Sequence, residues 1–278
     1  MLRWLAPVAG ALVFAVPAYG STGGASFFVS NCTFSHMSND DPIVWPRRPG
    51  YSHDHTFVGN VSTNAFSTLA TLRRARTSCA PADDTAAYWA PTLYVDGAPL
   101  APVGATAYYR RATTAKVRPF PLGFEMVAGD SHAVAAQSTA VTYWDCGVLK
   151  TNQYGFALPA ASSSIPVCPV KSQLELHVNF PECWDGRHLD SATHKSHVAY
   201  AVAGRCPAGH PVALPALTLV LRYPAAVVDA AQTVILSSGG QFSGHADFIN
   251  AWDEQALTRL VDSCLNAGVY CTPGTHLG

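Results

Sequence analysis

The residues best suited to chemistry in this chain are histidines and aspartates gathered between positions 36 and 60. This segment holds three of each, namely His36, His53, His55, Asp40, Asp41 and Asp54. Only 13% of the chain is charged, so such a concentration is not typical of ordinary solvated surface. His53 and His55 are two residues apart, which on an extended strand places both imidazoles on one face. That pattern favours proton transfer or metal binding, although a hydrogen-bonded network that only orders a loop stays open as an alternative.

Three further segments repeat this combination of residue types. They are HVNFPECWDG (177–186), HKSH (194–197) and GHADF (244–248). Loops carried by a rigid β-scaffold are where binding and catalytic groups concentrate. Each segment also has a structural interpretation: Asp185-Gly186 is a common turn pair, and His245 or Asp247 could prepare a helix start.

The elements that must position these residues are mostly strands. Short runs rich in aromatic and β-branched residues alternate with turn residues, as in SFFVS, PIVW, TFVGN, YWAPTLYV, FEMVA, AVTYW, LELHVNF, HVAYAVA, LTLVLRY and TVILSS. This pattern predicts an all-β fold, a β-sandwich or jelly-roll-like arrangement. Apolar spacing predicts short helices at 62–76 and 251–267, the second ending at Gly268. We expect two or three such helices to decorate the fold.

The first twenty residues have the features of a secretory signal peptide, with Arg3, an apolar run and a small-residue pattern before Ser21. We therefore expect residues 1–20 to be removed and residues 21–278 to form a single secreted domain. All eight cysteines lie in that domain, which predicts up to four disulfides. The sequence does not choose among the pairings, except that Cys264 and Cys271 are close enough to join locally.

Charge and hydropathy exclude several classes of partner. The formal net charge is −1 and no basic run exceeds Arg73-Arg74, so nucleic-acid binding lacks its electrostatic basis. No segment of the mature chain is long and apolar enough to cross a membrane. We expect a monomer that acts on a polysaccharide.

Several blocks of the chain resemble one known family. They are SHMSNDDPIVWP, PGYSHDHTFVGN, AYWAPTLY, HVNFPECWDG, DSATHKSHVAY, CPAGHPVALPAL and GHADFINAWD. In order and content they are similar to the domain-of-unknown-function family numbered nineteen ninety-six. That family comprises secreted fungal and actinobacterial proteins, sometimes joined to cellulose-binding or other wall-binding modules. The resemblance implies export and hints at polysaccharide, without implying a particular reaction. One difference is Ala251, where the family block has glycine.

The leading interpretation is a glycoside hydrolase, which usually needs two carboxyl groups on either side of the scissile bond. We take Asp185 and Asp247 as this pair, with the imidazoles of His53, His55 and His197 tuning protonation or holding the sugar. Residues expected to bind the sugar by hydrogen bonds or ring stacking are Asp41, Trp89, Asn179, Trp184 and His245. This mechanism requires no cofactor.

Two alternatives remain. A polysaccharide lyase would remove a proton beside a uronate with a histidine or tyrosine base, for which Tyr88, Arg187 and His197 are candidates. A non-catalytic metal- or wall-binding module would use His53 and His55 as divalent-metal ligands with a third histidine. His36 is the first choice for this third ligand, and His197 and His245 are the other candidates. A serine hydrolase is disfavoured because no Gly-x-Ser-x-Gly motif occurs.

Overall fold

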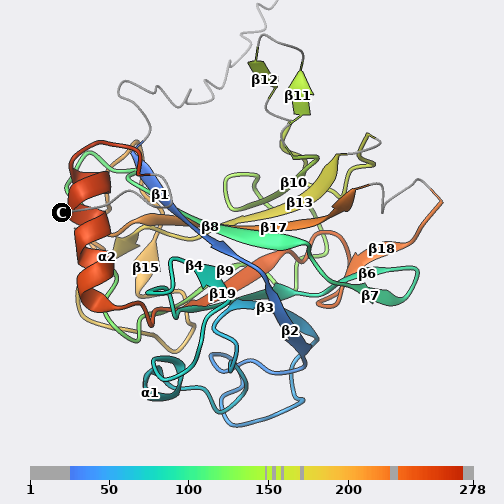
Figure 1. The fold of residues 1–278 in the computed structure, drawn as a ribbon, viewed down its shortest axis with the longest axis horizontal. Coiled ribbons are helices and arrows are strands. Elements are labelled where there is room, and N and C mark those ends of the chain that lie inside the picture. Colours follow the sequence, from blue (N-terminus) through green and yellow to red (C-terminus); the bar gives the residue numbers. More distant parts are fainter. Residues whose placement is uncertain are drawn as a thin grey trace, which may run out of the picture.

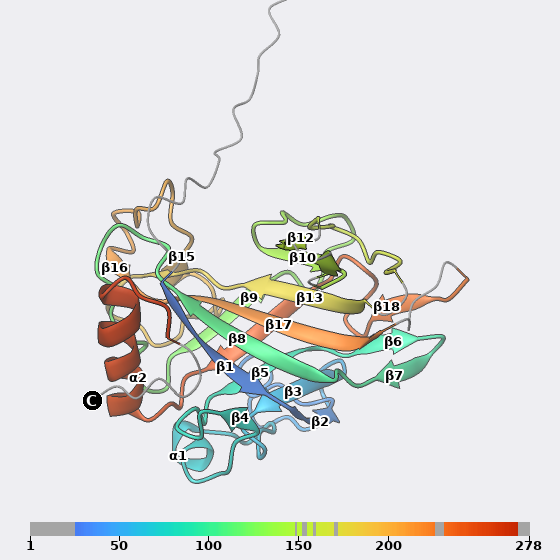
Figure 2. The ribbon, with the colours of Figure 1, turned by 45° about the horizontal axis from the view of Figure 1, so that its top comes forward.

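Two antiparallel sheets form the centre of the computed structural model, which describes residues 26–147, 149–151, 155–157, 160–169, 172–225 and 231–271. The larger sheet has the order β10 (Thr142–Asp145), β13 (Gln173–Asn179), β17 (Ala216–Ala225), β8 (Gly104–Arg110), β1 (Phe27–Cys32), β4 (Cys79–Ala80) (Figures 1 and 2). The smaller sheet has the order β2 (Phe34–Ser38), β3 (His55–Gly59), β5 (Ala87–Pro91), β19 (His245–Ile249), β9 (Glu125–Gly129). The predicted all-β fold is confirmed.

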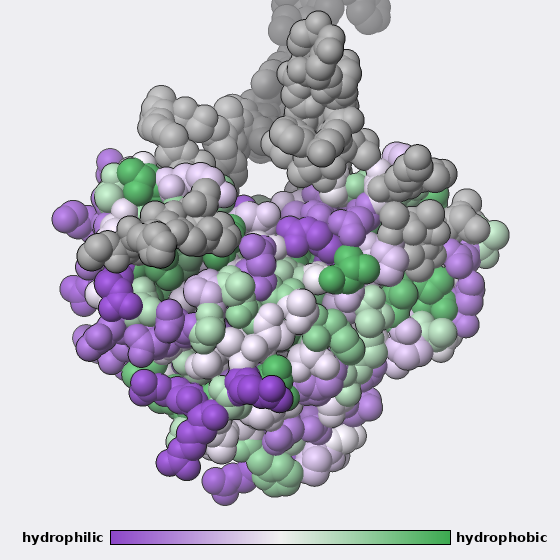
Figure 3. Space-filling model, in the orientation of Figure 1, coloured by the Kyte–Doolittle hydropathy of each residue, from purple (hydrophilic) through white to green (hydrophobic). Residues whose placement is uncertain are grey.

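Three smaller sheets complete the described strands. They are β15 (Val198–Ala199), β14 (Cys183–Trp184) and β16 (Val212–Ala213); β18 (Val234–Leu236), β6 (Leu93–Val95) and β7 (Ala98–Leu100); and the pair β11 (Leu149–Thr151) and β12 (Gly155–Ala157). Hydrophobic and hydrophilic residues are interspersed on the face of the molecule seen in Figure 3. No helix among the described residues is long and apolar enough to cross a membrane.

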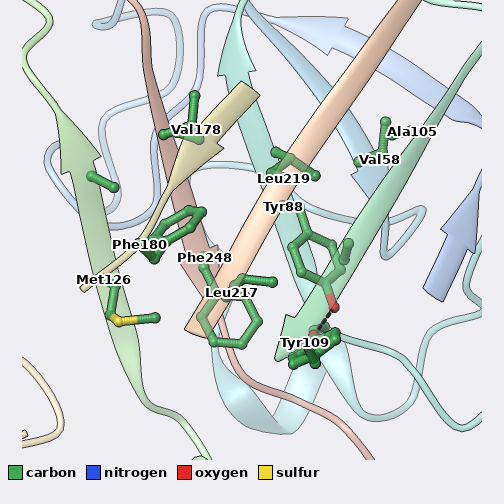
Figure 4. Close-up of a cluster of buried hydrophobic side chains, with 14 of the residues drawn as sticks. Val58, Tyr88, Ala105, Tyr109, Met126, Val178, Phe180, Leu217, Leu219 and Phe248 are labelled. Atoms are coloured by element: carbon green, nitrogen blue, oxygen red, sulfur yellow. Dashed lines mark hydrogen bonds between the residues drawn. The ribbon is translucent and has the colours of Figure 1, made fainter. Parts of the chain in front are cut away.

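The main hydrophobic core lies between the two large sheets. Val58, Tyr88 and Phe248 project into it from the smaller sheet, and Leu219 and Val178 meet them from the larger one (Figure 4). Successive side chains of a strand point to opposite faces. Because these residues face inward, their sequence neighbours in β3, β5 and β19 must face outward, away from the core.

One predicted strand is wrong. The run PIVW (42–45) forms turns in place of a strand. Pro42 and Pro46 stand on either side of its apolar residues. In addition, Oδ1 of Asp41 accepts hydrogen bonds from the backbone N–H groups of Ile43 and Val44. A side chain that satisfies local backbone donors in this way competes with sheet pairing.

The helices follow the prediction at one position and depart from it at the other. Near the C-terminus, α2 (Glu254–Leu260) continues as the π-helical segment η2 (Val261–Asn266), and Asp253 caps its N-terminus by accepting from Ala256. The helix predicted over 62–76 is reduced to α1 (Leu69–Leu72). There the Asn, Ser and Thr side chains before α1 bond to nearby backbone groups, as Asn64 does with Phe66, and so displace helical hydrogen bonds.

All eight cysteines are paired. The disulfides join Cys32 to Cys79, Cys146 to Cys168, Cys183 to Cys206 and Cys264 to Cys271. The predicted count and the local Cys264–Cys271 bridge are therefore confirmed. Disulfides of this number are typical of chains that fold in an oxidising compartment. The expected signal peptide lies outside the described residues.

A buried polar network crosses the core. The Tyr109 hydroxyl on β8 accepts a hydrogen bond from Nε1 of Trp252 (3.0 Å) and is hydrogen-bonded to the Tyr88 hydroxyl on β5 (Figure 4). Tyr88 in turn donates to the Asp84 carboxyl (2.8 Å). Burial raises the pKa of Asp84 to about 7, which fits a carboxyl group enclosed between apolar layers. The network connects the two sheets by hydrogen bonds.

We predict that Tyr109→Phe lowers the free energy of unfolding by about 1–3 kcal/mol, because it leaves the buried Nε1–H of Trp252 without its acceptor and the buried Tyr88 oxygen without its donor. Tyr270→Phe is the matched control, since Tyr270 is 52% exposed and its change should stay within about 0.5 kcal/mol. Urea unfolding of both variants measures the difference. Equal stability of the two would contradict the role given to the network.

Candidate functional site

The candidate site lies on the outer face of the smaller sheet, the face turned away from the main core. The register places Phe57, Trp89, Asp247 and Val127 side by side across β3, β5, β19 and β9. Part of this face carries a second small apolar cluster that includes Ile43, Phe57, Leu72 and Trp89. The rest is polar. Side chains alternate along a strand. His55 and Asp247 each lie next to an inward-facing residue, so both point to the outer face of the smaller sheet.

Two loops bring further polar groups over this face. The first, residues 39–54, begins at the end of β2 and carries Asp41 and His53. The second, residues 185–197, runs along the free edge of β9. There the backbone N–H of Glu125 donates to Leu189 O (2.9 Å) and that of Val127 to His194 O (3.3 Å). This pairing places Asp190, His194 and Lys195 next to β9.

Five side chains meet at the centre of this face, and we call them the histidine–aspartate cluster: Asp41, His53, His55, His245 and Asp247. One nitrogen from each of His53, His55 and His245 lies within 4.8 Å of the other two. The same limit holds for one donor atom each of Asp41, His55 and Asp247. His55 belongs to both groups, so the five form one assembly that could hold a metal ion.

The cluster is almost completely buried. His55 is 0% exposed, Asp247 1%, and Asp41 and His245 3% each. His245 and His53 approach through their Nε2 atoms at 3.2 Å. Within the described part of the chain, three atoms of the cluster have no hydrogen-bond partner. They are the two carboxyl oxygens of Asp247 and Nε2 of His55. Buried polar atoms are nearly always paired, so these three are exceptional.

Burial shifts the acid–base behaviour of every member of the cluster. It lowers the pKa of His53 to about 4 and that of His245 to about 3, and nearby positive imidazoles act in the same direction. Burial also lowers the pKa of His55 well below its usual range. For Asp247, burial and then the charge of Asp41 raise the pKa well above its usual range. The three imidazoles are therefore neutral at neutral pH, the form that binds metals.

More accessible groups surround the cluster, and we call them the rim group: Glu125, Asp190, His194 and Lys195. The Asp190 carboxylate is 2.9 Å from Nδ1 of His194, and their side chains are 33% and 23% exposed. Burial, followed by the charges of Asp190 and Asp41, raises the pKa of Glu125 to about 7. Lys195 donates to Gly129 O (2.5 Å). His194 has φ of +56°, a conformation that costs energy in a residue with a side chain.

A cleft of about 300 Å³ adjoins the rim group. Lys195, Val127 and Gly129 line it together with Tyr200 and Gln137. Gly129 is paired with His245, and Val127 with Asp247. The cleft thus borders the same strands that carry the cluster.

The structure places the other predicted site residues elsewhere. Asp185 accepts from the backbone of Arg187 and His188 and is 2.6 Å from the His188 ring. Burial alone would raise the pKa of Asp185, but the hydrogen bonds from His188 and Arg187 together outweigh this effect and lower the pKa to about 2. His197 bridges Ser191 Oγ (3.0 Å) and Glu125 O (2.8 Å) and so fastens the 185–197 loop to β9.

The remaining predicted binding residues contact protein groups. Trp89 is fully buried against Phe57, and Trp184 donates from Nε1 to His188 O (2.7 Å). Asn179 accepts from Thr218 on the larger sheet. His36, the first choice as third metal ligand, stacks on Phe57 and bonds to Thr63 O. His245 instead joins His53 and His55.

Of the rim group, the sequence indicated only the segment HKSH, which holds His194 and Lys195, and gave neither residue a role. Glu125 is the second residue of the run FEMVA, where a single acid at an outward position of an apolar strand is the one available signal. Asp190 and His194 are four residues apart in a loop, and their contact depends on the turn between them. Only the pairing of this loop with β9 shows that they belong to the site.

A second histidine–carboxylate group lies on the larger sheet. Nε2 of His177 is 3.1 Å from Asp145 and 3.2 Å from Glu175, and Glu175 is also paired with Arg222 (2.8 Å). Although these acids and His177 have donor atoms within metal-binding reach of one another, they satisfy one another by hydrogen bonds. This group is therefore explained as a structural ion-pair network.

The model of a protein family described as a domain of unknown function (DUF1996) matches residues 41–252. The chain therefore belongs to this family, as the sequence blocks indicated. The matched range contains the whole histidine–aspartate cluster and the whole rim group. No curated protein and no solved structure matches the chain.

We predict that His53 and His245 remain neutral at pH 5.5 in chelator-treated protein, because burial disfavours their charged forms. Unperturbed imidazoles titrate near pH 6.5, so the unfolded chain takes up these protons first. Proton uptake by these two residues in the unfolded chain therefore lowers the free energy of unfolding as the pH falls from about 6.5 toward 4. Long-range ¹H–¹⁵N spectra report the ring protonation directly. Titration of both rings near pH 6.5 would contradict the burial described above.

We further predict an opposite pH dependence at His177. Burial opposes its protonation, but hydrogen bonds and charges from Asp145 and Glu175 outweigh this effect and raise the pKa. The protonated ring therefore stabilises the fold below about pH 6.5, and this contribution is lost as the pH rises through the folded-state pKa. His177→Gln should be more destabilising in urea at pH 6 than at pH 8.5. A loss of unfolding free energy that is the same at both pH values would contradict the ion-pair network. His132→Gln, at a site where the side chain is 94% exposed, is the control.

Proposed function

We propose that this protein is an exported enzyme, a glycoside hydrolase, that cleaves a polysaccharide at the rim group. The observation that carries the proposal is the partly exposed His194–Asp190 pair near the Glu125 carboxyl, next to Lys195, which lines the cleft. The four disulfides support an extracellular place of action. The resemblance to proteins joined to wall-binding modules supports a polysaccharide as substrate.

Each member of the rim group has a chemical part in this proposal. A carboxyl group with a pKa near 7 can donate a proton to the departing glycosidic oxygen, and this part falls to Glu125. Asp190 binds Nδ1 of His194, which leaves Nε2 to accept a proton from the attacking water. The bond from the anomeric carbon to the leaving oxygen breaks while the bond to the water oxygen forms.

Accessibility is the reason for assigning these parts to the rim group. A sugar must touch both proton-transfer groups, and the side chains of Glu125 and His194 are partly exposed. Asp247, in contrast, is enclosed behind them, and Asp185 is held by its own turn. The proposal therefore moves the acid from Asp185 or Asp247 to Glu125. The strained backbone of His194 is consistent with a residue held in place for function.

A polysaccharide lyase is the second candidate, and one observation favours it. Lys195 directly follows His194, borders the cleft and lies near Asp247. A lysine ammonium beside a histidine base could offset the carboxylate charge of a uronate while the base removes the neighbouring proton. Hydrolysis and elimination differ in their products, so one assay separates them.

We predict that Glu125→Gln and His194→Gln each lower the rate of polysaccharide cleavage by about 10²–10⁴, the usual loss for a proton-transfer group. Thermal unfolding should show that both variants fold. Glu254→Gln, an exposed acid at the start of α2, is the matched control and should keep full activity.

Purified protein should be assayed on neutral glucans, mannans and uronate-containing polymers. New reducing ends without ultraviolet absorbance of unsaturated uronates indicate hydrolysis, and reducing ends with that absorbance indicate a lyase. Cleavage by wild type that persists in both the Glu125→Gln and the His194→Gln variants would overturn the assignment. A protein that binds insoluble wall material and cuts no polymer would refute the enzymatic proposal.

A further inference from the structure

We infer that the histidine–aspartate cluster binds one divalent metal ion of the zinc class at His55, with further ligands drawn from His53, His245, Asp41 and Asp247. This site lies behind the rim group and is independent of the reaction proposed there. Three imidazole nitrogens with carboxylate oxygens are the ligand types that zinc and its first-row neighbours take in proteins. Magnesium and calcium prefer sites made of oxygen atoms alone.

The spacing of the donor atoms suits a single ion. Ligand atoms about 2.0–2.2 Å from one tetrahedral zinc ion lie roughly 3.3–3.6 Å apart. The donor atoms of His53, His55 and His245 lie within 4.8 Å of one another, as do those of Asp41, His55 and Asp247. Small side-chain rotations therefore bring either set onto a common ion. Because His55 belongs to both sets, an ion at His55 can take its other ligands from His53 and His245 or from Asp41 and Asp247.

The atoms left without partners are the second and independent observation. Asp247 is 1% exposed and His55 0%. Among the described residues, both carboxyl oxygens of Asp247 and Nε2 of His55 have no hydrogen-bond partner. A buried carboxylate without a hydrogen bond or counter-charge is strongly unfavourable. A bound cation would supply the missing partner for all three atoms at once.

Backbone carbonyls orient two of the histidines. Nδ1 of His55 donates to Asp40 O (3.0 Å), and Nδ1 of His245 donates to Ser243 O (2.9 Å). A carbonyl oxygen only accepts, so the proton must reside on Nδ1 and the Nε2 lone pair faces the cluster. Histidines that bind metals are usually held by such a hydrogen bond from the other ring nitrogen. In His245 this lone pair accepts a hydrogen bond from Nε2 of His53 (3.2 Å), and a bound ion would take the place of that shared proton.

The second histidine–carboxylate group differs from the cluster, because its own charged groups balance one another. His177 lies between Asp145 and Glu175, and Arg222 neutralises Glu175. The described atoms of that group satisfy one another. The histidine–aspartate cluster has no arginine or lysine paired with Asp247 among the described salt bridges. The contrast points to a metal ion as the missing positive charge.

The test uses the untagged full chain, stripped with a chelator, dialysed and titrated with zinc chloride by calorimetry. We expect one equivalent to bind and thermal stability to rise with zinc concentration. Substitution with Co²⁺ should give visible absorption bands typical of mixed nitrogen and oxygen ligands. His245→Gln and Asp247→Asn should each weaken zinc binding roughly 100-fold, comparable with the loss of an important supporting group.

His177→Gln is the matched control, because it removes a buried histidine–carboxylate contact outside the cluster and should leave zinc affinity unchanged. If Asp247→Asn fails to fold, the cobalt spectrum of His245→Gln still decides the question. Absence of a stoichiometric zinc site in wild type would overturn the inference, and so would affinity unchanged in both cluster variants. No substrate is used, so this outcome is separate from success or failure of the proposed hydrolase.

Discussion

The alternation of side chains along three central strands is the constraint on which the rest of the structure depends. In β3, β5 and β19, Val58, Tyr88 and Phe248 face the core. Their register across the sheet then fixes Phe57, Trp89 and Asp247 on the outer face. A shift of one residue in any of these strands would turn its core residues to the outside. The free energy of core packing therefore holds the chemical groups in position.

Without the two loops that cover it, the outer face and its histidine–aspartate cluster would be open to water. The 39–54 loop is held by Asp41, which caps the amides of Ile43 and Val44, and by Asp40, which accepts from Gly50. The 185–197 loop is held by pairing with β9 and by His197. These covers exclude water from His55 and Asp247. Polar groups gathered in such a place interact more strongly than in water, which suits a metal centre with an accessible rim.

Much of the fold could be predicted from sequence because its signals are local. Strand periodicity gave the β-class, and Asp253 and Gly268 mark the ends of the last helix. The helix expected over 62–76 failed because Asn64 and its neighbours bond to their own backbone. The strand expected at 42–45 does not form because the Asp41 side chain accepts hydrogen bonds from the backbone of Ile43 and Val44. In both segments, side-chain hydrogen bonds outweighed the apolar pattern.

The site could be predicted only in part. The spacing of His53 and His55 showed that they share a face, since that relation depends on one strand. The third histidine could not be chosen, because the approach of His245 depends on strand order within the sheet. Glu125 and His194 were not recognised because their contact requires the 185–197 loop to lie along β9. Sequence spacing thus identified candidates, and tertiary pairing determined which of them meet.

The central claim is that a cation balances the buried carboxyl of Asp247. Crystals grown with zinc and measured on both sides of the zinc absorption edge test it most directly. The account predicts a single strong anomalous peak bounded by Nε2 of His55 and the carboxyl oxygens of Asp247. An ordered cluster with no anomalous peak, in which Asp247 is instead hydrogen-bonded to a protein group or water, would contradict it.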